Sequence, residues 1–332
     1  MSFHIIGDIH GQAGKLKALL HRLGYEQRQG AYRHPNAQVI FVGDFIDRGP
    51  HQLETLDIVR RMVDVGSARA IMGNHEFNAI AWHTPDPDAP GESLRPHGGL
   101  KGEKNRAQHQ VFLRELQDQP ARHADIVDWF KTLPLWLDLP GLRVVHACWH
   151  EGHMQALRPL LTPDHRLTDA VIVQASRDGS PAFRAVETLL KGIELPLPDG
   201  HSFHDKDGHE RHNVRVRWWL PGVHSYRDLA LMPDAAARAA LPDTPIPAHA
   251  VPPFAPDKPL FFGHYWMTGA PAPLHAMAAC VDYSAGNGGL GARAAATTTP
   301  RPAGTGALAG AVAQRDRPRV RRAHGHVLPG LR

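Results

Sequence analysis

Five short apolar segments of this chain each end in a cluster of glycine and polar residues. The segments cover residues 3–6, 39–42, 68–72, 144–145 and 260–262. The first three lead into GDIHG, GDFIDRG and GNHE, the fourth into a histidine, and the fifth into GH. Open α/β sheets build their binding sites from groups at the carboxyl ends of strands. We therefore expect buried strands that bring these clusters together.

Helical periodicity separates the first three apolar segments. Leu16, Leu19, Leu20 and Leu23 have the i, i+3, i+4, i+7 spacing that buries one face of a helix. A second helix is predicted from Leu53 to Gly66. Strands that alternate with helices predict an α/β layered fold.

In the rest of the chain, the predicted helices and strands alternate less regularly. Residues 84–134 are interpreted as a mostly helical insertion, and residues 154–256 as a variable region that could act as a cap. Helices are predicted at residues 107–117, 123–132, 182–191 and 228–241. Strands are predicted at residues 135–139, 142–147, 213–220, 259–263 and 278–283.

The composition changes abruptly after residue 284, so we predict one domain over residues 1–284. The last 48 residues contain eight arginines and one acid, and they have no Phe, Tyr, Trp or Ile. Such a segment cannot bury enough apolar surface to offset its ordering entropy, and we expect a disordered tail with nothing strand-like. A natural basic tail and a reading-frame error in GC-rich DNA both remain open, and the abrupt change favours the second.

Charge and cysteine content limit the function classes. The formal charge of +4 divides into +7 for the tail and −3 for the first 284 residues, so nucleic-acid binding is at most an accessory property of the tail. No apolar run is long enough to span a membrane, and the N-terminus does not resemble a signal peptide. Cys148 and Cys280 are too few for a disulfide framework. We therefore expect a cytoplasmic protein.

The residue types in the clusters match a pair of metal ions. Carboxylate, imidazole and amide groups suit manganese, iron or zinc, and none of the clusters requires a thiolate ligand. Two cations about 3.5–4 Å apart need a bridging carboxylate, and Asp44 is the natural bridge. We expect two divalent or trivalent ions, with manganese favoured and iron or zinc as alternatives.

The motifs GDIHG, GDFIDRG, GNHE, VH and GH, in this order, resemble those of the calcineurin-like metallophosphoesterases. The DRG within the second motif resembles the phosphoprotein-phosphatase branch, which includes bacterial serine/threonine phosphatases and symmetrical diadenosine tetraphosphatases. The resemblance extends over residues 1–283 in motif order. It implies a four-layer α/β fold in which two mixed β-sheets are sandwiched between helices.

The resemblance also implies a role for each motif residue. One metal would be held by Asp8, His10 and Asp44. The other would be held by Asp44, Asn74, His146 and His264. His75 would be the catalytic imidazole, paired with Asp47, and Arg48 would bind phosphate oxygens. A departure from the family follows the fourth strand, where His146-Ala-Cys-Trp-His150 replaces the usual His-Gly-Gly. This leaves His150 as a competitor for the ligand position of His146 and puts a protein substrate in doubt.

The implied activity is phosphoester hydrolysis, with in-line attack by a metal-bridging hydroxide on phosphomonoesters of proteins or small molecules. A symmetrical dinucleoside tetraphosphatase and a nucleotide phosphodiesterase are the alternatives within the enzyme class. A non-catalytic metal-binding protein is a further alternative, disfavoured because the full residue set is present. Arg215 or Arg217 could supply a second phosphate contact, although a surface or packing role is favoured for both. The oligomeric state is left open.

Overall fold

The computed structural model describes residues 2–204, 208–232, 234–247, 250–284, 295–298 and 311–312. Its first sheet has the strand order β15-β14-β1-β4-β5. The parallel strands are β1 (Ser2–Ile6), β4 (Ala37–Phe41) and β5 (Ala68–Ala70). They correspond to the first three apolar segments, so their carboxyl ends lie along one edge of the sheet.

The second sheet has the order β13-β12-β7-β6. It contains β6 (Trp136–Leu139), β7 (Leu142–Val145), β12 (Leu260–Phe262) and β13 (Ala278–Cys280). The strands β7, β12 and β13 run parallel, and β6 is antiparallel to β7. A buried apolar cluster joins the two sheets, with Ile5 and Ile40 from the first and Val144 and Phe261 from the second.

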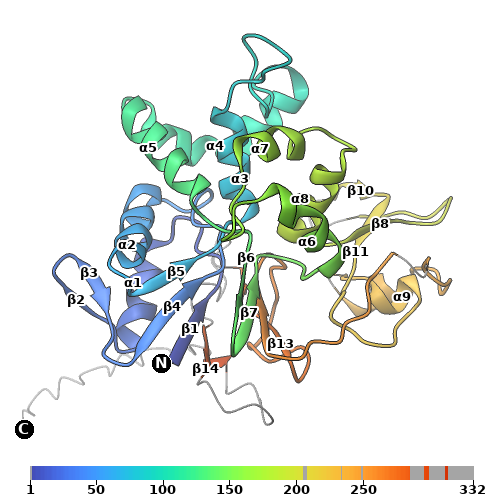
Figure 1. Cartoon of the computed structure of the whole chain (residues 1–332). Helices are drawn as coiled ribbons and strands as arrows, with labels where there is room; N and C mark the ends of the chain where they lie inside the picture. Colours follow the sequence, from blue (N-terminus) through green and yellow to red (C-terminus); the bar gives the residue numbers. More distant parts are fainter. Residues whose placement is uncertain are drawn as a thin grey trace, which may run out of the picture.

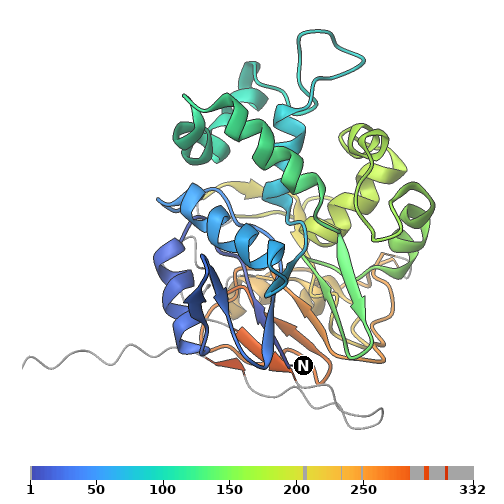
Figure 2. The ribbon, with the colours of Figure 1, turned by 60° about the vertical axis from the view of Figure 1, so that its left-hand side comes forward.

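Helices cover the outer faces of both sheets (Figure 1). The first sheet is flanked by α1 (Ala13–Arg22) and α2 (Gln52–Asp64). Beside the second sheet lie α6 (Glu151–Leu157), α7 (Asp169–Ala175) and α8 (Pro181–Lys191). Above them stand α3 (Asn74–His83), α4 (Gly99–Leu116) and α5 (Pro120–Lys131), which Figure 2 shows from another side. The predicted arrangement of two mixed sheets between helices is confirmed.

Several predicted elements differ from the structure. The helix expected at 107–117 begins eight residues earlier, as α4, and the strand expected at 213–220 is only β11 (Asn213–Arg215). The helix expected at 228–241 is wrong, because two short helices, α9 (Tyr226–Leu229) and α10 (Ala235–Ala239), take its place. The sequence between them contains a proline at position 233, which lacks the N–H that a continuous helix needs.

The remaining short elements lie at the periphery. They are β2 (Glu26–Arg28), β3 (Ala31–Arg33), the 3₁₀ helix η1 (Arg158–Leu160), β8 (Glu194–Pro196), β9 (Phe203–His204) and β10 (Glu210–Arg211). Within the described residues, no helix is both long and apolar enough to cross a membrane.

The expectation that the tail offers nothing strand-like is wrong for two segments. The strand β14 (Ala295–Thr298) pairs antiparallel with β1, with Phe3 opposite Thr298 and Ile6 opposite Ala295. The strand β15 (Ala311–Val312) pairs in turn with β14. Sheet pairing uses backbone groups, so it does not require the hydrophobic pattern on which the expectation rested. The other residues after 284 lie outside the described part of the chain.

Candidate metal centre

The five strand-end clusters meet at the edge where the two sheets come together. Asp8 and His10 follow β1, Asp44 follows β4, Asn74 follows β5, His146 follows β7, and His264 follows β12. All of these except His264 are buried side chains. The structure therefore brings every predicted ligand from five strands into one region.

Asp44 lies at the centre of this group, and its two carboxylate oxygens face different histidines. Its Oδ2 atom is 3.7 Å from His10 Nε2, and its Oδ1 atom is 3.4 Å from His146 Nε2. Two sets of three residues share Asp44, and within each set the potential ligand atoms lie within 4.8 Å of one another. The first set is His10, Asp44 and His75. The second set is Asp44, His146 and His264. This geometry suits a carboxylate that bridges two cations.

The amide oxygen of Asn74 belongs with the second set. It lies 3.1 Å from His146 Nε2 and 2.9 Å from His264 Nδ1. Nitrogen and oxygen atoms that converge in this way offer one cation three ligands from three different strand ends.

Backbone hydrogen bonds fix the rings of two histidines. His10 Nδ1 donates to the carbonyl of Ile46 at 2.8 Å, and His146 Nδ1 donates to the carbonyl of Val42 at 2.7 Å. Each bond leaves Nε2 directed at Asp44, as is usual for metal-bound histidine. Burial, followed by the charge of His75, lowers the pKa of His10 to about 3, so its ring is neutral and able to act as a ligand.

The chemistry of the site fits bound cations. His10 Nε2 and His264 Nε2 are buried without a hydrogen-bond partner among the described residues. Burial raises the pKa of Asp8 well above its usual value, and the nearby carboxylates of Asp282 and Asp44 raise it further. Burial also raises the pKa of Asp282, to about 6. Three buried carboxylates that repel one another are stable as anions when a positive ion lies between them.

The loops that carry these ligands are held by a buried carboxylate. Glu76 accepts hydrogen bonds from the backbone N–H groups of Asp44, Phe45 and Gly73, at 2.8, 2.8 and 2.9 Å. The loops also approach closely, since a Cβ atom on Gly43 would lie 2.4 Å from the nitrogen of Gly73. Gly43 has a φ of +95°, so glycine is needed there for both space and conformation.

Backbone strain is concentrated at the site. Six non-glycine residues in or next to the site have a positive φ. They are His10, Asp44, Asp47, Arg48, His264 and Trp266. L-residues adopt this conformation at a cost, and it persists where the surrounding structure enforces it. The strain is consistent with a site whose ligand positions are fixed before anything binds.

A chain of three side chains leads away from the centre. His75 Nδ1 lies 2.5 Å from Asp47 Oδ2, and His109 Nδ1 from α4 lies 2.8 Å from Asp47 Oδ1. Burial would lower the pKa of His75, but Asp44 and Asp47 outweigh it and raise the pKa. The structure thus confirms the predicted contact between His75 and Asp47, and it adds His109.

Two details bear on the predicted ligand sets. Asp8 is in neither of the two sets, and its carboxylate accepts from the backbone N–H of His264 at 3.2 Å. His75 is in the first set, with His10 and Asp44. His150 lies apart from both sets, at the N-cap of α6, where its Nδ1 accepts from the N–H of His153. His146 is the better placed of the two competing histidines.

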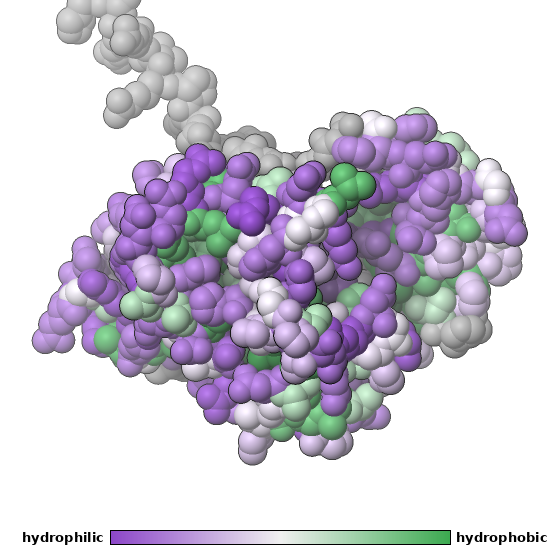
Figure 3. All heavy atoms as spheres, turned by 90° about the horizontal axis from the view of Figure 1, so that it is seen from above, coloured by the Kyte–Doolittle hydropathy of each residue, from purple (hydrophilic) through white to green (hydrophobic). Residues whose placement is uncertain are grey.

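A pocket of about 560 Å³ opens over the centre. Four cationic side chains line it, namely Arg48, Arg95, Lys191 and Arg215, together with Asn74, His75 and His264. Lys191 pairs with Glu187 and Arg215 with Glu194, whereas Arg48 and Arg95 form no ion pair with a carboxylate among the described residues. Seen from above, the molecule presents mainly hydrophilic residues (Figure 3). These features suit an anionic ligand.

Comparison with known families settles the relationship that the motifs suggested. The family model described as Calcineurin-like phosphoesterase matches residues 1–172. The chain belongs to this family. The resemblance inferred from GDIHG, GDFIDRG and GNHE is therefore confirmed. Membership of the family implies metal ions, which the two sets of residues around Asp44 could hold.

Individual relatives cover shorter stretches. A bis(5′-nucleosyl)-tetraphosphatase PrpE [asymmetrical] from Halalkalibacterium halodurans is 47% identical over 76 residues, which is 23% of this chain and 31% of the relative. One from Oceanobacillus iheyensis is 32% identical over 153 residues, 46% of this chain and 56% of the relative. The matched part of this phosphoesterase therefore spans between 31% and 56% of their length. A solved structure named as a putative diadenosine tetraphosphatase covers 89% of this chain and 87% of its own, at 15% identity and a TM-score of 0.41.

Sequence reasoning missed three residues of this phosphoesterase site. Asp282 comes two residues after the end of β13, so the strand-end rule could have found it, but no glycine precedes it. His109 lies within helix α4, and Arg95 lies in a Pro/Gly-rich loop. Neither of these two has a local signal, because only the packing of α4 over the sheets brings them to the site.

Proposed function

We propose that this chain is a metal-dependent phosphoester hydrolase with two metal ions. The observation that carries the proposal is Asp44, which two sets of potential ligands share beneath a pocket lined by Arg48 and Arg95. Asp8, His10 and Asp44 would hold one ion, and Asp44, Asn74, His146 and His264 the other. When bound, the ions would supply Lewis-acid activation of water and of the phosphoryl group.

The chain's own residues would bind and orient the substrate. Arg48 and Arg95 present guanidinium groups to the pocket, and Arg95 is held by the neutral side chains of Asn78 at 2.8 Å and Gln108 at 2.9 Å. Both arginines therefore keep their positive charge available for phosphate oxygens, which a guanidinium can bind in a bidentate manner.

His75 would donate a proton to the leaving oxygen. Its Nδ1 is held by Asp47, and its Nε2 lies 3.9 Å from Asp44 Oδ2, while the residue lines the pocket. The two carboxylates that raise its pKa favour the protonated ring, which is the form a general acid needs. Asp47 would act by orienting the ring.

A dinucleoside polyphosphatase is a second candidate for the substrate class. A single phosphomonoester needs few cations, whereas four cationic side chains line this pocket, and a chain of phosphates would use more of them. The relatives named as tetraphosphatases point the same way. Their names specify asymmetrical cleavage, whereas the motif resemblance suggested the symmetrical reaction.

The test is a substrate panel with purified protein loaded with manganese, iron or zinc in turn. Nitrophenyl phosphate, a phosphoserine peptide and diadenosine tetraphosphate should be compared. We expect hydrolysis of at least one and none after chelation. From diadenosine tetraphosphate, two ADP would identify symmetrical cleavage, and ATP with AMP would identify asymmetrical cleavage. Absence of hydrolysis with every metal would contradict the proposal.

We further propose a reducing, cytoplasmic location, because Cys148 and Cys280 are both free and buried.

A further inference from the structure

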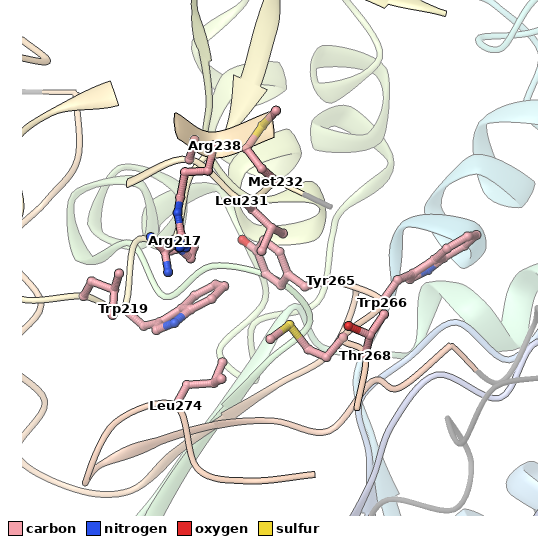
Figure 4. Close-up of a pocket in the computed structure, with 12 residues that line it drawn as sticks. Arg217, Trp219, Leu231, Met232, Arg238, Tyr265, Trp266, Thr268 and Leu274 are labelled. Carbon is pink, nitrogen blue, oxygen red and sulfur yellow. The ribbon is translucent and has the colours of Figure 1, made fainter. Parts of the chain in front are cut away.

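A second pocket has a volume of about 420 Å³, and Figure 4 shows the residues that line it. Its lining comes from the segment after β11, from α10 with the segment that precedes it, and from the loop after β12. We call it the arginine–aromatic pocket and define it by Arg217, Trp219, Met232, Arg238, Tyr265 and Met267. Its volume is within the range of about 300–1,000 Å³ that is usual for small-molecule sites.

The pocket is lined by two arginine side chains, Arg217 and Arg238. Neither Arg217 nor Arg238 forms an ion pair with a carboxylate in the part of the chain that the structure describes. Arg217 donates to the backbone carbonyl of Asp228, and its Nε is buried without a partner among the described residues. Burial and the nearby charge of Arg238 lower the pKa of Arg217. Two guanidinium groups held near each other in this way favour an anionic ligand.

The other walls are aromatic and apolar. Trp219 and Tyr265 line the pocket with Met232, Met267 and Leu274. In Figure 4, Arg217 and Arg238 extend toward Trp219, with Tyr265 across from them. Flat aromatic rings and polarisable thioethers favour contact with a planar ring such as a nucleobase.

Residues that are neighbours in the sequence line the two pockets. His264 lines the pocket over the metal centre, and the next residue, Tyr265, lines the arginine–aromatic pocket. Likewise, Arg215 lines the pocket over the metal centre, and Arg217 lines the arginine–aromatic pocket. Residues two positions apart in an extended segment point to the same side, so both arginines lie on one face of it. Trp266 extends away from Trp219 in Figure 4, and the guanidinium of Arg48 lies 3.9 Å above its ring. Positive charge therefore continues from one pocket into the next.

Building on the hydrolase function proposed above, we propose that the arginine–aromatic pocket binds the nucleoside 5′-phosphate end of a nucleotide substrate, whose scissile phosphate lies at the metal centre. A phosphate chain would account for cationic groups in both pockets, and a base would account for the aromatic walls. A phosphopeptide with one phosphate would supply no anionic group to Arg217 and Arg238.

Binding of AMP, adenosine and inorganic phosphate to the full metal-loaded chain tests the proposal by calorimetry, independently of turnover. In Arg217→Gln/Arg238→Gln we expect AMP affinity to fall about tenfold or more, from the loss of hydrogen bonds to a charged group. Phosphate affinity should fall less, because phosphate can bind at the metal centre. Unchanged AMP affinity, or an equal loss for AMP and phosphate, would overturn the proposal.

Two further variants separate binding from folding. Thr268→Glu places a carboxylate at an exposed position of the same pocket, and it should also weaken AMP binding. Arg227→Gln is the matched control, because Arg227 lies in the same region but pairs with Asp243 outside the pocket. It should leave AMP binding unchanged. A loss in the control equal to that in the double variant would overturn the assignment to this pocket.

Turnover distinguishes this proposal from the hydrolase function. In the double variant, the ratio of kcat/KM for diadenosine tetraphosphate to that for nitrophenyl phosphate should fall about tenfold. An unchanged ratio would overturn the nucleoside site while the hydrolase function stands. If no substrate is hydrolysed but AMP binding responds as expected, the hydrolase proposal fails and the nucleotide site stands.

Discussion

The Nδ1 atom of His109 lies 2.8 Å from Oδ1 of Asp47, the carboxylate whose other oxygen holds His75. Asp47 is therefore fixed from both sides, by imidazoles from α4 and from the start of α3. Burial would raise the pKa of Asp47, but its contacts with His109 and His75 hold the pKa well below its usual value. The helical insertion is thereby connected to the proposed general acid.

Removal of the His109 donor should slow the reaction without loss of metal. His109→Phe keeps a ring of similar size but cannot donate to Asp47, so His75 loses part of its orientation. We expect kcat to fall about tenfold, as for other residues that orient active-site groups. His109→Asn, which can still donate, should recover much of the rate. Equal losses in both variants would show that His109 acts only through packing.

Substitution of His75 should have an effect that depends on the leaving group. Nitrophenolate departs readily without a proton, so His75→Asn should reduce nitrophenyl phosphate hydrolysis least. The leaving group of a phosphoserine peptide is a serine alkoxide, which departs poorly without a proton. The rate of its hydrolysis should fall by a further factor on the order of ten to a hundred. Parallel metal analysis is essential, because His75 lies within reach of His10 and Asp44. Loss of metal would make His75 a ligand rather than the acid.

The competing histidines can be separated by a pair of variants. His146→Ala should lose metal, because His146 Nε2 lies 3.4 Å from Asp44 Oδ1. His150→Ala should retain metal, since that residue only caps α6. Metal content after dialysis is the measurement, and the reverse result would move the ligand position to His150.

Truncation after residue 284 should lower stability but not the specific activity of folded protein. It removes β14 and leaves the β1 edge of the first sheet unpaired. We expect Tm to fall by about 2–4 °C for each kcal/mol by which the loss of strand pairing lowers the free energy of unfolding. Truncation after residue 312, which retains β14 and β15, is the control and should keep the Tm of the full chain. An unchanged Tm in the shorter protein would mean that β14 contributes nothing.

The sequence was informative where a side chain follows a buried strand. Asp44 and His146 could be predicted because strand ends in a layered α/β fold converge on one edge. His109 could not, because its role depends on how α4 packs over another segment 62 residues away. The strand β14 was missed for a different reason, since strand pairing uses backbone atoms and needs no hydrophobic pattern in the sequence.

The most direct test of the central claim is metal content per chain in three proteins after dialysis. The wild type should retain two ions, because two sets of ligand atoms share Asp44. Asp44→Asn should lose most of its metal, and Asp8→Asn should lose less, because Asp8 is proposed to serve one ion. Two tightly bound ions in Asp44→Asn would contradict the account, since no bridging carboxylate would then be needed.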